Sequence, residues 1–312
     1  MTALEERASD LVAAATGHRG LPQLLARGAN SRVYAVGEDL VVKHYDPTPP
    51  GRRDRMETEW EALGFLAEAG VPGVPRPVAR DAEARLAVFS RLPGRHLEAV
   101  DEAAVRAAAR FLRRLQEAAR TSARAGRLPA ASDAGFSKAQ HLAVVRARFE
   151  ALAGVPEPGL RDLLDGEAAR LLEALAPDLE DPEVLGPEER ILSPSDFGFH
   201  NALRGGDGVL RFVDFEYFGW DDPAKTVADF FHQPAVPTPP ELFGVFLEEL
   251  APLPATLERA RLLYPLQGLK WALLLLNPYL RPSGQEVRTG RLEKARRKIQ
   301  RTWEERAAGP PF

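Results

Sequence analysis

The sequence contains no cysteine among its 312 residues. Disulfide bonds, thiolate metal sites and a cysteine nucleophile are therefore excluded. The sequence also has no run of about 18 consecutive apolar residues, so we expect no membrane-spanning helix. Residues 1–6 include two glutamates and no basic residue, unlike the positively charged start of a secretory signal peptide. Together these absences predict a cytoplasmic protein.

The sequence also lacks a large excess of charge of one sign. The formal net charge is −4, which provides no overall basic field for nucleic acid or an anionic membrane. We therefore expect neither partner, and the composition indicates no particular oligomeric state. Hydrophobic residues make up 45% and charged residues 28% of the chain, as is typical of a globular protein, and this length favours about two domains.

The first 90 residues have the pattern of a small sheet lobe. Residues 4–16 predict a short amphipathic helix, and residues 55–66 predict a second helix. Short runs of strand-forming residues between turn signals predict five strands, at residues 21–26, 33–36, 39–45, 78–80 and 85–90. We therefore interpret residues 1–90 as one lobe.

The loop after the first predicted strand contains Gly28, Asn30 and Ser31. Its backbone N–H groups and the Ser31 hydroxyl are able to cover phosphate groups. It is not a Walker A loop, because no Gly-Lys-Ser or Gly-Lys-Thr follows. The same residues also suit an ordinary hairpin turn, so the loop by itself leaves both interpretations open.

Lys43 lies in a predicted strand, and alternation places it on the same face as Val41 and Tyr45. A strand lysine is often a solvated edge charge, but one that points into a lobe needs an anionic partner. Glu59 is the candidate partner, because helical spacing places it on the apolar face of the second helix with Leu63. Either Glu59 borders the solvated side of that helix, or it pairs with Lys43 and holds the lysine against nucleotide phosphates.

Beyond Gly94 the chain is predicted to be mainly helical, and we place a lobe boundary at residues 90–94. Backbone groups at such a crossing, at Ser90 and Leu92, are able to bind the edge of an adenine. The predicted helices are residues 101–120, 137–153, 159–176, 223–231, 240–250, 255–276, with a break at Pro265, and 287–306. The last is rich in arginine and lysine, and we interpret it as a solvated face.

Residues 191–216 carry the most informative pattern. The turn Gly205-Gly206-Asp207-Gly208 lies between strand-like residues 201–204 and 209–216 and predicts a hairpin. Its open end would bring Asn201 and Asp214 together, with Asp196 in the preceding loop. An amide and a carboxylate suit Mg²⁺, and the remaining carboxylate is free to act as a base. The alternative is that these side chains only cap turns.

The combined motifs resemble those of the aminoglycoside phosphotransferase and choline kinase-like enzymes. The motifs of the first lobe are Gly28-x-Asn30-x-x-x-Tyr34-x-Val36, Val41-Val42-Lys43 and Glu59-x-x-x-Leu63-x-x-Leu66. The motifs of the second part are Asp196-x-x-x-x-Asn201, Phe212-Val213-Asp214-Phe215-Glu216 and Gly219-Trp220-Asp221-Asp222-Pro223. The resemblance covers roughly residues 20–275.

The resemblance implies an α+β, bilobal, protein-kinase-like fold that binds ATP and Mg²⁺ between its lobes. Residues 1–90 would form the nucleotide-binding lobe, and residues 91–312 the catalytic and substrate-binding lobe. Nucleotide-binding roles are implied for Gly28, Asn30, Ser31, Lys43, Glu59, Ser90 and Leu92. Asp196 would accept the proton of the substrate hydroxyl, and Asn201 and Asp214 would hold Mg²⁺.

Two residues depart from the family pattern. Pro194 occupies the position, two residues before the catalytic aspartate, where the family usually has a histidine that braces the loop. Thr226 stands where an aspartate is frequent, and Asp229 is a candidate substitute. His200, beside Asn201, has either a catalytic role or a role in packing the loop, and we favour packing.

These observations predict an ATP-dependent phosphotransferase acting on a hydroxyl of a small molecule, such as a sugar, an amino alcohol or an aminoglycoside. The alternatives are a nucleotide-binding regulator without turnover, which Pro194 motivates, and a kinase acting on protein. Tyr217, Trp220 and Asp221 follow the metal-binding segment and either line the acceptor pocket or belong to the core.

Overall fold

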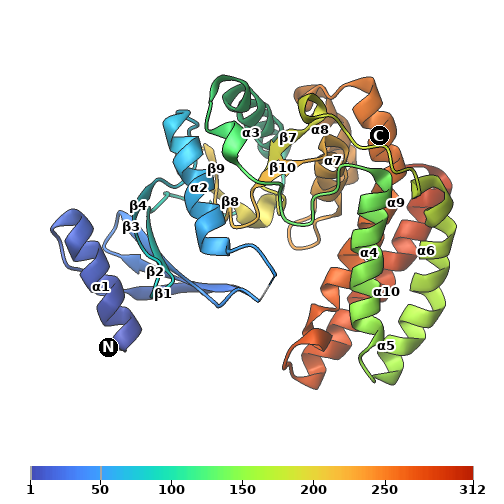
Figure 1. The fold of residues 1–312 in the computed structure, drawn as a ribbon, viewed down its shortest axis with the longest axis horizontal. Helices are drawn as coiled ribbons and strands as arrows, with labels where there is room; N and C mark the ends of the chain where they lie inside the picture. The colour runs from blue at the N-terminus through green and yellow to red at the C-terminus, as the bar shows by residue number, and fades with distance from the viewer. Residues whose placement is uncertain (1, 50, 312) are drawn as a thin grey trace.

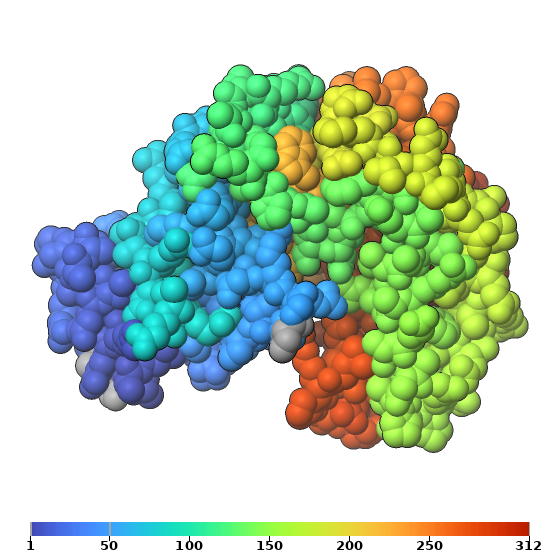
Figure 2. Space-filling model, viewed as in Figure 1, coloured from blue at the N-terminus to red at the C-terminus, as the bar shows by residue number. Residues whose placement is uncertain are grey.

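The computed structural model describes residues 2–49 and 51–311, which form a small lobe built on a sheet and a larger, mainly helical lobe (Figure 1). The expected α+β architecture is thereby confirmed. The space-filling view shows a hollow between the small lobe, in blue, and a pillar of helices in green and orange-red (Figure 2). Among the described residues, no helix combines the length and the apolar character needed to cross a membrane.

The small lobe is an antiparallel sheet with strand order β1, β2, β3, β5, β4. The bounds of its strands are β1 (Gln23–Arg27), β2 (Ser31–Val36), β3 (Leu40–Tyr45), β4 (Pro77–Asp81) and β5 (Leu86–Ser90). All five predicted strands are confirmed, with bounds shifted by a few residues. Two helices accompany the sheet, α1 (Ala3–Thr16) and α2 (Arg55–Glu68).

Each face of this sheet packs against one helix. Ala8 and Val12 of α1 cluster with Val42 of β3, whereas Tyr45 of β3 belongs to the core cluster that contains α2. Successive strand residues point to opposite faces, so Lys43 lies on the same face as Tyr45, next to α2. Local sequence fixes where α2 begins, because the Asp54 side chain accepts a hydrogen bond from the backbone N–H of Glu57.

The second part of the chain is mainly helical. Its longer helices are α3 (Glu102–Thr121), α4 (Lys138–Ala153), α7 (Pro223–His232), α8 (Phe243–Leu250), α9 (Pro254–Leu275) and α10 (Gln285–Ala308). The predicted helix at 159–176 is α5 (Pro158–Leu163) and α6 (Ala169–Leu175), joined by the π-helical turn η2 (Leu164–Ala168). Short 3-10 turns also occur: η1 (Ala125–Arg127), η3 (Ala176–Leu179), η4 (Pro187–Glu189), η5 (Phe199–Asn201), η6 (Pro240–Leu242) and η7 (Asn277–Leu280).

Two small sheets lie between the lobes' cores. The strand β6 (Arg95–His96), which the sequence pattern missed, pairs with β8 (Ala202–Arg204), and β8 pairs with β9 (Leu210–Phe212). The strand β7 (Ile191–Ser193) pairs with β10 (Gly219–Asp221). The pairing of β6 with β8 joins the β8–β9 hairpin to the segment just after the lobe boundary.

The predicted break at Pro265 is wrong, because α9 continues through that residue. A proline removes one backbone hydrogen bond and usually kinks a helix. Here Pro265 is buried, as are Leu263, Tyr264 and Leu266 around it. Tertiary packing on both sides therefore holds the helix in a conformation that the local sequence disfavours.

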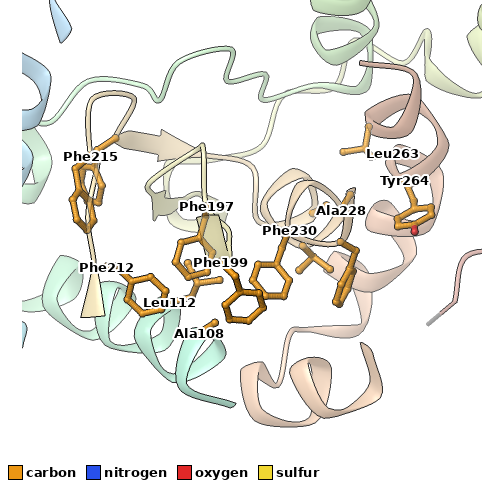
Figure 3. Close-up of a cluster of buried hydrophobic side chains, with 14 of the residues drawn as sticks. Ala108, Leu112, Phe197, Phe199, Phe212, Phe215, Ala228, Phe230, Leu263 and Tyr264 are labelled. Atoms are coloured by element: carbon orange, nitrogen blue, oxygen red, sulfur yellow. The ribbon is translucent and has the colours of Figure 1, made fainter. Parts of the chain in front are cut away.

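Phenylalanine rings join the loop after β7 to the core of the large lobe (Figure 3). Phe197 lies 5.1 Å from Phe212 and 5.6 Å from Phe230 between ring centroids, and Phe199 lies 5.4 Å from Phe230. Phe111 of α3 completes the group at 4.5 Å from Phe212. Phe197 and Phe199 thus anchor this loop in the core, which limits the path of the polar residues on either side of them.

The buried imidazole of His232, at the end of α7, contacts both α9 and α10. His232 lies with Nε2 at 2.7 Å from the Tyr264 carbonyl, and Lys298 Nζ lies 2.8 Å from His232 Nδ1. Burial and the nearby Lys298 charge hold the pKa of His232 well below its usual value, so the ring is neutral and its Nδ1 accepts from the lysine. Burial also lowers the pKa of Lys298, to about 8.

Replacing Gly219 by alanine should lower the free energy of unfolding by about 1–3 kcal/mol, the usual range for overpacking. A Cβ at this position would meet the Pro129 carbonyl oxygen and would lie 2.6 Å from the Ala131 nitrogen, and backbone cannot easily move aside. The matched control is Gly290→Ala on α10, where an added Cβ meets nothing within 4 Å. The control should be more stable by up to about 1 kcal/mol, because alanine favours helix. Equal urea midpoints for Gly219→Ala and wild type would contradict the close pairing of β10.

Stability should rise with pH between about 8 and 10. The Lys298 pKa is about 8 in the folded chain against an ordinary value of 10.5, so the unfolded chain binds more protons within this window. The expected slope from this group is up to about 1.4 kcal/mol per pH unit. Urea unfolding at pH 8, 9 and 10 should show a smaller slope for Lys298→Met than for wild type. The exposed Lys294→Met, on the same helix, should keep the wild-type slope, and an unchanged slope in Lys298→Met would reject the assignment.

Candidate active site

Lys43 is a buried cation surrounded by three carboxylates. Its Nζ lies 2.6 Å from Glu59 Oε2, 2.7 Å from Asp214 Oδ1 and 3.2 Å from Glu216 Oε2. Only 6% of Lys43 and 3% of Glu59 is exposed, so water contributes little to balancing the charge. Burial alone would lower the pKa of Lys43, but Asp214 and Glu59 raise it well above its ordinary value. The predicted pairing of Lys43 with Glu59 is confirmed, and the lysine is charged.

Glu59 connects the two lobes. In addition to its bond with Lys43, Glu59 Oε2 accepts a hydrogen bond of 2.7 Å from the Tyr45 hydroxyl. Its Oε1 accepts a hydrogen bond of 3.1 Å from the backbone N–H of Phe215, in the large lobe. Burial raises the pKa of Glu59, and the nearby Lys43 opposes this rise. One carboxylate therefore holds α2, β3 and the segment after β9 in a single arrangement.

Two arginines attach α2 to the large lobe in addition. Arg124 forms ion pairs with Glu61, at 2.8 Å, and with Glu68, and its guanidinium lies over Gly64. A side chain at Gly64 would meet this guanidinium, since a Cβ there would lie 2.7 Å from Nη2. Arg53, just before α2, donates to the backbone carbonyls of Ala130 and Phe218. The helix that carries Glu59 is thus fixed at both ends and along its length.

The predicted hairpin is present, but its second strand is shorter than expected. Strand β9 ends at Phe212 rather than at residue 216, and Asp214 has a left-handed backbone with φ of 69°. The backbone N–H of Val213 donates to the Asn201 carbonyl at 2.9 Å, so the chain just before Asp214 lies beside Asn201 at the open end. The Asp214 carboxylate itself is held by Lys43 in the small lobe.

Glu216 also belongs to this site, a role that the sequence pattern does not assign to it. Among the described residues, Glu59, Asp214 and Glu216 form a group whose ligand atoms lie within 4.8 Å of one another and could hold a metal ion. Glu216 is buried, and its Oε2 accepts no hydrogen bond from the part of the chain that the structure describes. The signal in the sequence that could have identified Glu216 is its position two residues after Asp214, because residues two apart in the predicted strand 209–216 share a face.

The loop with Gly28, Asn30 and Ser31 reaches across to the large lobe. The Asn30 amide donates to Glu216 Oε1 at 3.0 Å and to the Tyr217 hydroxyl at 2.6 Å. The backbone N–H of Gly28 donates to the Ser31 carbonyl at 2.9 Å, which closes the loop as a hairpin turn. This loop therefore lies beside the carboxylates, and its predicted contact with nucleotide phosphates stays a prediction.

The crossing residues Ser90 and Leu92 lie at the boundary where the sheet ends. The Ser90 backbone N–H donates to the Arg76 carbonyl, and the Ser90 hydroxyl accepts from the Arg76 N–H, both at 2.9 Å. The Ser90 N–H is therefore occupied within the small lobe. Leu92 is half-buried in the segment leading to β6. A role of these two residues in binding an adenine is a prediction that the geometry leaves untested.

The loop that carries Asp196 is braced without a histidine at position 194. The Pro194 carbonyl accepts a hydrogen bond of 2.9 Å from the Asp196 N–H, and Ser195 between them has φ of 65°. The Ser195 hydroxyl donates to the Ser132 carbonyl at 2.8 Å and lies 3.3 Å from Lys225 Nζ. The amide of Asn201 donates to the Asp196 carbonyl at 3.1 Å, which closes the loop from its other end.

Lys225 is part of a buried ionic network beneath this loop. It pairs with Asp221 at 2.5 Å and with Asp229 at 3.3 Å, and Lys270 pairs with Asp229 at 2.6 Å. Burial would lower the pKa of Lys225, but Asp221 and Asp229 raise it above its ordinary value. The hydroxyl of Thr226, where the family frequently has an aspartate, donates to the Asp222 carbonyl at 3.2 Å. The support under the loop is therefore a lysine held by two aspartates.

The three residues considered for an acceptor pocket have different surroundings. Asp221 is fully buried against Lys225, and the Trp220 indole donates to the Ala125 carbonyl at 3.0 Å. Asp221 therefore belongs to the interior of the large lobe, whereas Trp220 is half-buried. Tyr217 lies beside Asn30 and Glu216 at the edge of the site, and burial together with the Glu216 charge raises its pKa. Of the three residues, Tyr217 is the one in contact with the carboxylate network.

Comparison with known proteins gives a consistent result. A family model described as the phosphotransferase enzyme family matches residues 23–263. The solved ternary complex of streptomycin, ATP and APH(2″)-IIa superposes with a TM-score of 0.66 at 16% identity, covering 98% of this chain and 99% of that chain. A choline/ethanolamine kinase family protein from Mesorhizobium loti gives a TM-score of 0.63 at 20% identity, covering 98% of both chains.

Choline kinase LicA from Streptococcus pneumoniae is also similar, with a TM-score of 0.62 at 15% identity and coverage of 96% of this chain and 100% of that chain. No curated protein sequence matches the chain. At these identities the structural likeness shows a shared fold, and the predicted protein-kinase-like architecture is thereby confirmed.

Replacing Lys43 by methionine should lower the free energy of unfolding at pH 7.5 by about 3–5 kcal/mol, because it leaves buried carboxylates without their cation. Part of this loss should return at pH 5.5. Burial already raises the pKa of Glu59, and removing Lys43 raises it further, so the folded variant binds more protons than the unfolded chain. Urea unfolding at both pH values measures the effect. Lys294→Met, an exposed control, should match wild type, and a fully stable Lys43→Met would contradict the burial of this network.

Proposed function

This chain belongs to the phosphotransferase enzyme family, and from that premise we propose that it transfers the γ-phosphoryl group of ATP to a hydroxyl group of a small molecule. The observation that carries the proposal is the meeting of Lys43, Glu59 and Asp214 in one network beside the Asp196 loop. Small-lobe and large-lobe residues far apart in the sequence contribute to it. A purely structural ion pair needs only one cation and one anion. Here one lysine lies among three carboxylates, and the separately braced loop of Asp196 lies beside them.

Lys43 would bind the α- and β-phosphates, with Glu59 fixing its direction. Catalysis of phosphoryl transfer depends mostly on positioning and on neutralising charge, and a buried lysine whose pKa is raised provides a permanent positive charge. The loop with Gly28, Asn30 and Ser31 would cover the phosphates from above. Similar solved structures are described as complexes with ATP, ADP or GDP, which supports a purine nucleotide as donor.

The donor set fits Mg²⁺. Asp214 and Glu216 offer carboxylate oxygens that lie close together, and Asn201 would add an amide oxygen. Glu216 Oε2 is buried and accepts no hydrogen bond within the described chain, although Lys43 Nζ lies 3.2 Å away. Oxygen ligands of this kind are those that Mg²⁺ prefers. When bound, the ion would neutralise negative charge on the phosphates. We propose Asn201 and Asp214 as its ligands, with Glu216 as an additional one.

Asp196 would act as the base. In the transfer, the acceptor O–H bond breaks and its proton passes to the Asp196 carboxylate. A new bond forms between the acceptor oxygen and the γ-phosphorus, and the bond from that phosphorus to the bridging oxygen of ADP breaks. The hydrogen bonds within its loop would hold Asp196 for this step, and Asn201 from the same loop would connect base and metal site. The contribution of such a base is on the order of 10²–10⁴ in rate.

The acceptor would enter the hollow between the lobes (Figure 2). Tyr217 lies at the edge of the carboxylate network and is the residue of that segment placed to meet it. Similar structures are described as complexes with streptomycin or gentamicin, or as choline kinases. We therefore propose a hydroxylated small molecule of the sugar, amino alcohol or aminoglycoside class.

The function is tested in two steps. Thermal unfolding with and without ATP, in the presence and absence of Mg²⁺, should show stabilisation that is larger when both are present. An ADP-release screen over sugars, amino alcohols and aminoglycosides should then identify an acceptor. Binding without turnover on any acceptor would favour a regulator instead, and incorporation of phosphate into polypeptide would favour a protein kinase.

Two substitutions separate the proposed roles. Asp214→Ala should abolish Mg²⁺-dependent nucleotide binding and turnover, whereas Asp196→Asn should keep nucleotide binding and lose about 10²–10⁴ in turnover. Asp207→Asn, in the exposed turn of the same hairpin, is the matched control and should behave as wild type. Full activity of Asp214→Ala would remove the metal assignment, and full activity of Asp196→Asn would show that Asp196 is only a turn residue.

A further inference from the structure

The imidazole of His200 lies against the carboxylate of Asp196. His200 Nε2 is 3.3 Å from Asp196 Oδ1, and the two residues are four apart in the chain. Both side chains are largely covered, with 21% of His200 and 33% of Asp196 exposed. The sequence favoured a packing role for His200, whereas this contact places a ring nitrogen beside the carboxylate of the proposed base.

Each residue has a buried polar atom that nothing else satisfies. Asp196 Oδ1 and His200 Nδ1 are both buried and have no hydrogen-bond partner among the described residues. Leaving a buried polar atom unpaired is costly, so these positions call for a local explanation. For Asp196 Oδ1, the neighbouring polar group that is able to supply a hydrogen bond is Nε2 of His200. No other ion pair of Asp196 occurs in residues 2–49 and 51–311.

The buried position of Oδ1 also decides which oxygen can meet a substrate. Because Oδ1 has almost no exposed surface, the exposed third of the Asp196 side chain lies on its other atoms, and Oδ2 is the oxygen among them. A carboxylate with one oxygen turned inward and one outward is oriented, and orientation is what a base in phosphoryl transfer requires.

The fold holds the two side chains on one side of the loop. Phe197 and Phe199 are anchored in the aromatic core (Figure 3), and Asp196 and His200 flank these two anchors in the sequence. Gly198 makes room for the ring, since a Cβ there would lie 3.1 Å from His200 Nδ1 and 2.8 Å from Gln233 Cγ. In the sequence Asp-Phe-Gly-Phe-His, the two phenylalanines anchor the loop in the core, and the aspartate and the histidine form the polar pair. The glycine leaves room for the imidazole ring.

We propose that His200 is the positioning residue of the base: when the acceptor binds, its Nε2–H donates to Asp196 Oδ1 and leaves Oδ2 to accept the proton of the acceptor hydroxyl. The inference rests on the proposed function, because it assumes that Asp196 is the base. In the structure the two atoms lie 3.3 Å apart but are not aligned as a hydrogen bond, and catalytic hydrogen bonds commonly align only when a substrate binds. His200 itself takes no proton from the substrate in this proposal.

The kinetic test compares two substitutions at this position. His200→Leu removes the N–H donor, whereas His200→Gln keeps a donor at similar reach. The assays are hydrolysis of ATP·Mg²⁺, with water as acceptor, and transfer to any acceptor found by the screen. We expect kcat of His200→Leu to fall about 10- to 100-fold with the nucleotide Kd within about threefold of wild type. His200→Gln should recover kcat to within about fivefold, and the exposed control His18→Leu should behave as wild type.

A spectroscopic test needs no turnover. Nitrogen-15 spectra of the histidine rings, with His200 assigned by its loss in His200→Gln, should show the Nε2–H tautomer with slowed hydrogen exchange. In Asp196→Ala this exchange should become faster. An Nδ1–H tautomer, or a His200 signal indifferent to Asp196→Ala, overturns the inference.

The remaining outcomes are also decisive. Wild-type kcat in His200→Leu overturns the positioning role while leaving the proposed function intact. An equal loss of kcat in both His200 variants, accompanied by a lower melting temperature, assigns His200 to packing alone. If wild type binds nucleotide but neither hydrolyses ATP nor phosphorylates any acceptor, the proposed function fails and the positioning role fails with it.

Discussion

The structure depends on one buried charge, the ammonium of Lys43, and on the carboxylates that compensate it. A lysine inside a lobe would lose most of its hydration and be neutral unless anions surround it. Glu59, Asp214 and Glu216 do so, at distances between 2.6 and 3.2 Å. Arg55, 3.9 Å from Glu216, is a second cation here, so three carboxylates against two cations leave an excess of negative charge. Under the proposed function, such an excess would favour a nucleotide that arrives with a divalent cation.

The same network couples the lobes mechanically. Glu59 accepts from Lys43 and Tyr45 in the small lobe and from the Phe215 N–H in the large lobe, so α2 cannot move outward without exposing a charge. Arg124 lies across Gly64 and reinforces this attachment. The position of α2, and therefore of the lysine it supports, is set by the folded chain itself.

A second buried charge cluster supports the loop of Asp196. Lys225, held by Asp221 and Asp229, lies against the Ser195 hydroxyl, and Ser195 in turn bonds to the Ser132 backbone. This arrangement makes the proline at position 194 compatible with an ordered loop, because contacts from below the loop are added to the hydrogen bonds within it. The regulator hypothesis, which rested on Pro194, therefore loses its main motivation.

Local patterns determined much of this protein. Strand alternation placed Lys43 toward α2, helical spacing placed Glu59 on the inner face, and turn chemistry predicted the hairpin that brings Asn201 to Asp214. Each of these is a short-range property, since side-chain direction follows from the backbone period. The order of the motifs was enough to identify the family and the bilobal fold.

Contacts between distant segments were decided only by the tertiary structure. The inclusion of Glu216, the burial of Asp221, the continuity of α9 through Pro265 and the approach of His200 to Asp196 all depend on which surfaces pack together. No periodicity in the sequence reports such contacts, because the energy of burying a charge or completing a helix depends on neighbours supplied by other parts of the chain. The sequence by itself therefore determined the faces on which Lys43 and Glu59 lie. The packing of the two lobes decided which side chains share a site with them.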